Sequence, residues 1–89
     1  MLYHFMTTPD GTTVSYSEII RQSDKEIVRV YAEKWNEKHN DFDSIEIFLP
    51  ECKEIKVVGF SQKEAKKHIK HFRNLKKVIW ACASEESGL

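Results

Sequence analysis

One long amphipathic helix is the feature that most constrains what this chain can fold into. In residues 61–86 apolar side chains recur every three or four positions, and at about 100° per residue they fall within an arc of roughly 120°, the width of a core-facing stripe. This apolar stripe consists of Ala65, Ile69, Phe72, Leu75, Ile79 and Ala83. Ser61 and Glu64 have the spacing of a capping box, which satisfies free backbone N–H groups at a helix start. The sequence therefore predicts a helix that begins at Ser61 and packs its stripe on a core.

The C-terminal part of this helix has two interpretations. Residues 76–83 alternate Val78, Trp80 and Cys82 on one side and have the propensity of a short final strand. The apolar stripe, however, continues through this segment without a change of phase, and residues 87–88 (Ser-Gly) supply a helix stop. We therefore favour one continuous helix.

The residues before the helix have the pattern of antiparallel strands. Short stretches alternate with period two, or are rich in β-branched and aromatic residues, as strands are. The expected strands cover residues 2–7, 12–16, 26–35, 45–49 and 55–58. In the first strand, alternation puts Tyr3 and Phe5 on one side and Met6 on the other. Ile19 and Ile20 can extend the second strand.

Turn-forming residues separate these strands. Residues 9–11 (Pro-Asp-Gly) stand in the order that a tight turn uses, and residues 23–25 (Ser-Asp-Lys) indicate a second reversal. Residues 36–41 have no apolar side chain to bury, so we predict that they form the most flexible loop. Pro50 ends a strand because it cannot donate a hydrogen bond to a ladder.

The strand at residues 26–35 presents two rows of side chains that could face the helix. The aliphatic row consists of Val28, Val30 and Ala32. The other row carries the rings of Tyr31 and Trp35. Both rows are apolar enough to be buried, so the pattern leaves open which of them the helix covers.

Length and composition allow one compact unit. With 89 residues and 40% hydrophobic content, the chain can build a single core, so residues 1–89 are expected to form one domain. The predicted fold class is α+β: an antiparallel meander of four to five strands, covered on one face by the long C-terminal amphipathic helix. Two cysteines, with no charged and apolar leader at the start of the chain, favour a cytoplasmic location. The longest apolar run, residues 78–83, is far shorter than the roughly 20 residues that span a bilayer, so we expect no membrane segment.

The net charge of zero hides an uneven distribution. Residues 61–77 hold seven basic side chains and one acidic side chain, while residues 1–60 hold seven and eleven. Six of the cations share the side of the helix opposite the apolar stripe, and we call them the basic stripe: Lys63, Lys66, Lys67, Lys70, Arg73 and Lys77. Such a stripe is typical of a solvated helix face, and it could also contact the phosphates of a nucleic acid, with Tyr31, Trp35 or Trp80 stacking on bases.

No metal or cofactor site is expected. His68 and His71 lie three residues apart on one flank of the helix, but Cys82 on the same flank is about 16 Å further along the axis, and Cys52 or His4 would have to come from the sheet. The histidines are expected to be partly exposed and a cysteine to be buried for structural reasons.

Catalytic motifs are also missing, and a chain of this size has little room for a large pocket. Acidic and basic side chains such as Glu46, Glu54 and His39 are not brought together by any pattern, so we expect no enzyme activity. The leading hypothesis is a protein–protein interaction module that can self-associate, with Tyr31 and Trp35, joined by Phe48 from the next strand, as interface aromatics. The alternative is nucleic-acid binding through the basic stripe.

Overall fold

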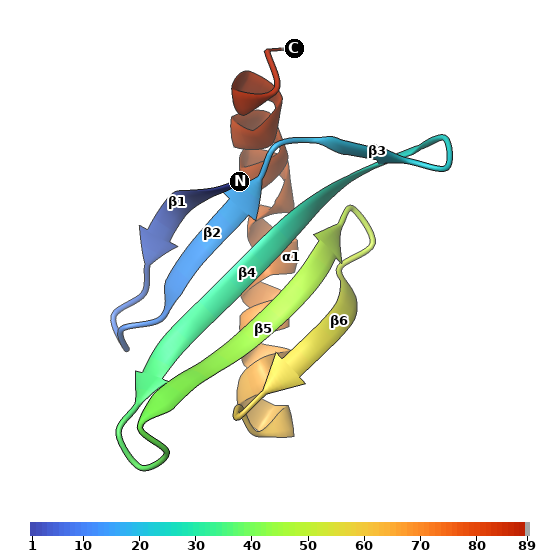
Figure 1. Ribbon diagram of the computed structural model, residues 1–89. Coiled ribbons are helices and arrows are strands. Elements are labelled where there is room, and N and C mark those ends of the chain that lie inside the picture. Colours follow the sequence, from blue (N-terminus) through green and yellow to red (C-terminus); the bar gives the residue numbers. More distant parts are fainter. Residues whose placement is uncertain (89) are drawn as a thin grey trace.

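The computed structural model describes residues 1–88 and has a six-stranded antiparallel sheet with a single helix across one face (Figure 1). The elements are β1 (Leu2–Thr7), β2 (Thr13–Ser17), β3 (Ile20–Gln22), β4 (Lys25–Asn36), β5 (Asp41–Leu49), β6 (Lys53–Val58) and α1 (Gln62–Glu86). The strand order is β1-β2-β4-β5-β6, and β3 pairs with one end of β4. The α+β class and the covered antiparallel sheet are confirmed, with one short strand more than expected.

Strand β4 is the central strand of the sheet. It is longer than the stretch of alternating apolar residues from which it was predicted. It pairs with β2 on one side and with β5 on the other, where the register runs from Val28 opposite Leu49 to Asn36 opposite Asp41. The loop predicted for residues 36–41 is therefore wrong in extent, since only residues 37–40 form the turn. Strand pairing joins backbone groups and therefore does not depend on apolar side chains. The side-chain amide of Asn36 also donates to the Asp43 carboxylate (3.1 Å), which stabilises the polar end of the hairpin.

The second strand does not run on through Ile19 and Ile20. It ends at Ser17, whose hydroxyl accepts a hydrogen bond from the backbone N–H of Arg29 (2.9 Å) and donates to the carbonyl of Glu18 (2.8 Å). A side chain thus replaces the backbone ladder at this point. The chain resumes pairing as β3, with Ile20 opposite Ile27.

Both edges of the sheet carry a bulge. In β1 the register shifts between His4 and Met6, so Phe5 is an extra residue and Met6 lies opposite Val14. Met6 therefore packs against the core together with Tyr3 and Phe5, and the prediction that it faces the other side is wrong because the bulge resets the alternation. In β6 the register shift falls between Glu54 and Lys56, which pair with Ile47 and Glu46 of β5. Bulged edge strands discourage further strands from pairing there.

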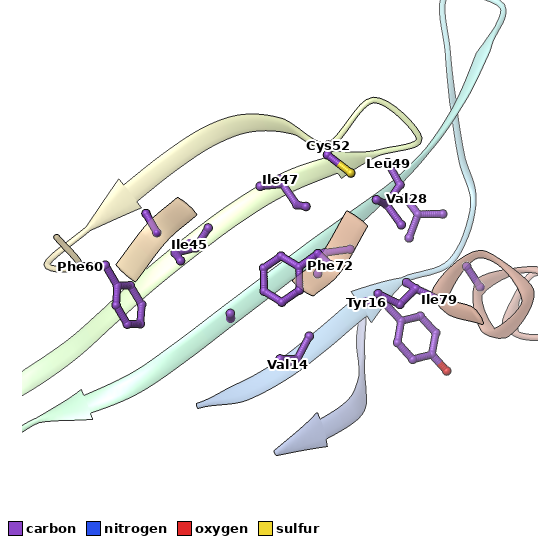
Figure 2. Close-up of a cluster of buried hydrophobic side chains, with 14 residues drawn as sticks. Val14, Tyr16, Val28, Ile45, Ile47, Leu49, Cys52, Phe60, Phe72 and Ile79 are labelled. Carbon is purple, nitrogen blue, oxygen red and sulfur yellow. The ribbon is translucent and has the colours of Figure 1, made fainter. Parts of the chain in front are cut away.

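The core fills the space between α1 and the aliphatic row of β4. Val28, Val30 and Ala32 are fully buried beneath the helix, and Phe72 lies over the middle of the sheet (Figure 2). From the apolar stripe, Ala65, Phe72, Ile79 and Ala83 are buried, while Ile69 and Leu75 are half-buried against the same cluster. The stripe predicted from the sequence is thus the face that packs on the sheet.

Polar contacts fix both ends of α1. Ser61 is the N-cap: its hydroxyl accepts from the Glu64 N–H (3.2 Å), and the Glu64 carboxylate accepts from the Ser61 N–H (3.3 Å), which confirms the capping box. The helix continues through residues 76–83 to a cap at Ser87, so the alternative of a final strand is wrong. The Ser87 hydroxyl also accepts from the Ile19 N–H (2.8 Å), which joins the helix end to the sheet.

Candidate functional site

The sheet face opposite α1, called the open face here, is covered by no other element of residues 1–88. Four aromatic side chains lie on it, two from each of the central strands: Tyr31, Trp35, Phe42 and Phe48. Trp35 and Phe42 are directly opposite each other in register, with ring centroids 5.1 Å apart and an edge-to-face arrangement. Each of these two side chains is 47% exposed. Large rings left half in water are a typical mark of a binding surface.

An ion pair lies among the rings of the open face. The guanidinium Nε of Arg29 donates to the Glu46 carboxylate at 2.8 Å, and both side chains are partly shielded from solvent. In the register, Arg29 is opposite Phe48 and Glu46 is opposite Tyr31. The pair therefore links the two central strands across the middle of the face.

The open face carries the three predicted interface aromatics Tyr31, Trp35 and Phe48. Of the two rows of β4 side chains that could face the helix, α1 therefore covers the aliphatic row. Their role as interface residues stays a prediction. Sequence reasoning missed Phe42 because the expected strand began at residue 45. Counting back in steps of two from Phe48 would have reached it on the same side.

The basic stripe lies on the side of α1 that faces away from the sheet, and Lys67 at its edge also borders a groove between α1 and the β1–β2 turn. All six of its residues are exposed, and none of them forms an ion pair within the part of the chain that the structure describes. The sheet stands between this stripe and the rings of Tyr31 and Trp35, so these two cannot stack on a base bound there. Trp80 is half-buried and packs on the core. The stripe therefore lacks the aromatic neighbours that the sequence suggested for it.

A second concave region, called the turn groove here, lies between the β1–β2 turn and the first half of α1. It has a volume of about 420 Å³ and is lined by Thr8, Pro9, Asp10, Glu64, Lys67, His68 and His71. No motif in the sequence pointed to it, because the turn and the helix are more than fifty residues apart. Only the closure of the sheet against α1 brings them together.

The Asp10 carboxylate in this groove is held by several donors. It accepts hydrogen bonds from the Thr8 hydroxyl and from the Thr12 N–H (3.2 Å), and the Lys34 ammonium lies 3.7 Å away. The Thr8 hydrogen bond is the main cause that lowers the pKa of Asp10 far below its ordinary value, followed by the bonds from Thr12. Asp10 therefore stays ionised over the whole physiological pH range.

His68 is buried, at 9% exposure, although the sequence suggested a partly exposed histidine. It is three residues after Ala65 and four before Phe72, so it shares their face of the helix. Its ring lies between those of Phe60 and Phe72, at centroid distances of 5.2 and 6.3 Å. Burial among these rings is the main cause that lowers the pKa of His68 below its ordinary value of 6.5.

The buried His68 should make the fold sensitive to mild acid. The unfolded chain, with the ordinary pKa of 6.5, binds a proton more readily than the folded chain, whose His68 pKa is lower. The contribution of His68 to the free energy of unfolding is therefore fully present above pH 6.5. It is lost as the pH falls through the pKa of His68 in the folded chain. Urea unfolding at about pH 7.5 and about pH 5.5 should show this loss in the wild type and not in His68→Phe.

The control for this prediction is His39→Gln, which removes an exposed histidine from the β4–β5 turn and should keep the wild-type pH dependence. A His68→Phe variant that loses as much stability in acid as the wild type would contradict the prediction.

Residues 1–88 place no three His, Cys, Asp or Glu side chains where they could share a metal ion. Cys52 and Cys82 are both free thiols, and Cys52 is buried in the core. No helix in this described region is long and apolar enough to cross a membrane.

Comparison with known protein families, with curated proteins and with solved structures gives no match to this chain. The functional assignment therefore rests on the geometry of its own residues.

Proposed function

We propose that this protein is a non-catalytic, cytoplasmic interaction module that binds another protein chain through its open face. The observation that carries the proposal is the row of half-exposed aromatic rings, above all Trp35 and Phe42 at 47% exposure each. Aromatic residues and arginine are enriched in protein interfaces, and on this face Arg29 lies opposite Phe48 and two residues before Tyr31. The opposite face of the sheet is already occupied by α1, so within residues 1–88 this is the sheet face that remains free to bind.

A second copy of the chain is the partner that we propose. Five strands about 4.8 Å apart and about six residues long give a face of close to 500 Å² per copy, or about 1,000 Å² in total. That area reaches the lower limit for a specific interface and predicts a weak dimer. The face carries charges of both signs, among them Glu33, Glu46 and Lys56, so two copies need not repel each other. Because both sheet edges are bulged, face-to-face packing is favoured over edge pairing.

Nucleic-acid binding through the basic stripe is the second candidate. It is supported by six exposed lysine and arginine side chains without ion pairs in residues 1–88. It is weakened by the position of Tyr31 and Trp35 on the other side of the sheet, since single-stranded nucleic acids are usually held by stacking as well as by charge.

Sedimentation equilibrium tests the dimer. For an interface of this size, the dissociation constant of the dimer should lie between about 10 μM and about 1 mM. Over this concentration range the apparent mass should rise from 10.5 kDa toward twice that value. Replacing Trp35 and Phe42 together with serine should remove the two most exposed rings of the face and keep the chain monomeric. Trp35 fluorescence should shift to shorter wavelength on assembly of the wild type, since the indole leaves water.

The matched control is Val78→Ser, which removes an apolar side chain of 52% exposure from the helix layer. This variant should dimerise like the wild type. A wild-type mass of one chain across the whole concentration range would refute the proposal. Equal weakening by Val78→Ser and by the double variant would move the interface away from the open face.

A further inference from the structure

The turn groove holds basic groups that the rest of the protein leaves unengaged. Lys67, His68 and His71 line it from α1, and none of the three forms an ion pair within residues 1–88. Their side chains also lack hydrogen-bond partners among those residues, unlike the other polar groups of the groove. A cavity with several free donors on one wall is suited to a ligand that can accept from them.

His68 is the strongest pointer to such a ligand. The residue is 9% exposed and borders the groove, and the neighbouring rings of Phe60 and Phe72 offer neither donor nor acceptor. Within residues 1–88 the Thr12 hydroxyl oxygen is the one fully buried side-chain polar atom without a partner, so the His68 ring nitrogens keep access to the groove. A ligand in the groove can therefore form hydrogen bonds with them.

The two carboxylates of the groove are already committed to the protein itself. Asp10 accepts from Thr8 and Thr12, and Glu64 accepts from the backbone and the hydroxyl of Ser61 (3.3 and 3.0 Å). They are thus less available to a ligand than the three basic side chains, but their charges still act across the groove. A ligand here must carry acceptors and cannot carry a large negative charge.

We propose that the turn groove binds a small organic molecule through a single carboxylate group, which accepts from Lys67, His68 and His71. A carboxylate carries one negative charge and is repelled less by Asp10 and Glu64 than a phosphate dianion would be. The volume of about 420 Å³ exceeds that of a carboxylate alone and falls within the range of small-molecule pockets, about 300–1,000 Å³, so the rest of the molecule lies along Pro9. This site is separate from the open face and does not depend on the proposed dimer.

Binding should tighten in mild acid. The charged groups that face the two histidines are Lys67 and Glu64 on α1 and Asp10 on the turn, with Lys34 of β4 beside Asp10. Burial lowers the pKa of His68, and a bound carboxylate opposes this effect because it stabilises the charged imidazole, so proton binding to His68 and ligand binding favour each other. The protonated His68 imidazole is a charge-assisted donor to the carboxylate.

The imidazole NMR signals of the full chain provide the test, because the four histidines report on different places. Benzoate is the probe, inorganic phosphate is the competing anion and sodium chloride controls for ionic strength. Benzoate should shift the His68 and His71 signals saturably, with a Kd of about 1–10 mM for so small a molecule. His4 on β1 and His39 in the β4–β5 turn lie outside the groove and should not move.

Two lysine variants locate the effect. Lys67→Gln should weaken benzoate binding about tenfold, while Lys77→Gln, which removes an exposed lysine from the same helix outside the groove, should leave it unchanged. The proposal is overturned if all four histidines shift together, as they would for a general ionic effect. It is also overturned if phosphate binds more tightly than benzoate, or if the two lysine variants behave alike.

Discussion

Replacing Phe72 with alanine is expected to lower the free energy of unfolding by about 3–5 kcal/mol, the range for a large ring removed from a close-packed core. Phe72 is 1% exposed and lies over the centre of the sheet, where the buried residues of β2, β4 and β5 meet the helix (Figure 2). Because a domain of this size has a total stability of about 5–15 kcal/mol, this one change should bring the chain close to unfolding. Urea denaturation followed by circular dichroism measures the loss.

The matched control is Phe42→Ala, which deletes the same ring from the open face. At 47% exposure, Phe42 leaves a smaller cavity and loses less contact, so the cost should be below about 1 kcal/mol in dilute solution. Similar costs for the two variants would mean that the open face is already buried at low concentration, which would contradict a two-layer arrangement with only α1 on the sheet.

Much of the helical layer could be predicted from the sequence because one signal is repeated many times. The apolar stripe from Ala65 to Ala83 runs over about five turns, and Ser61 with Glu64 marks the start of the helix, so local geometry and burial agree. His68 was misplaced because a titratable side chain was assumed to prefer water. Its position between Ala65 and Phe72 decided otherwise, since the helix has no way to turn one residue out of a packed face.

The sheet was predicted less completely because strand ends depend on partners. Asn36 and Asp41 are strand residues through backbone pairing with each other, which no side-chain alternation reveals. The bulge in β1 moved Met6 to the core side, and a bulge of this kind has no mark in the sequence. Phe42 was lost for the same reason, because the strand was taken to start where its apolar residues start.

The candidate sites differ in how far the sequence could reach them. The open face follows from alternation along two neighbouring strands, and only the choice between its two sides needed the structure. The turn groove joins Asp10 to His68 across most of the chain, so it depends on the tertiary fold alone. Side chains that are adjacent only through topology cannot be paired from one sequence without a motif.

Replacing Gly59 with alanine is expected to cost about 2–4 kcal/mol of unfolding free energy, from two separate causes. Gly59 links β6 to the helix cap with φ +83°, a conformation that costs any residue with a Cβ about 1–2 kcal/mol. A Cβ at this position would also overlap the Asp43 carboxylate, which must then move and give up its hydrogen bond from Asn36. Urea unfolding of the variant measures the sum of the two effects.

Two further variants separate these causes. Gly11 has φ +90° and nothing within 4 Å of the position of a Cβ, so Gly11→Ala should lose only the backbone part, about 1–2 kcal/mol. Asp43→Ala removes the carboxylate that the new methyl group would meet, so combining it with Gly59→Ala should cost less than the sum of the two single changes. Strict additivity of the two would show that Asp43 does not confine Gly59. The hinge between sheet and helix would then require glycine for its backbone conformation alone.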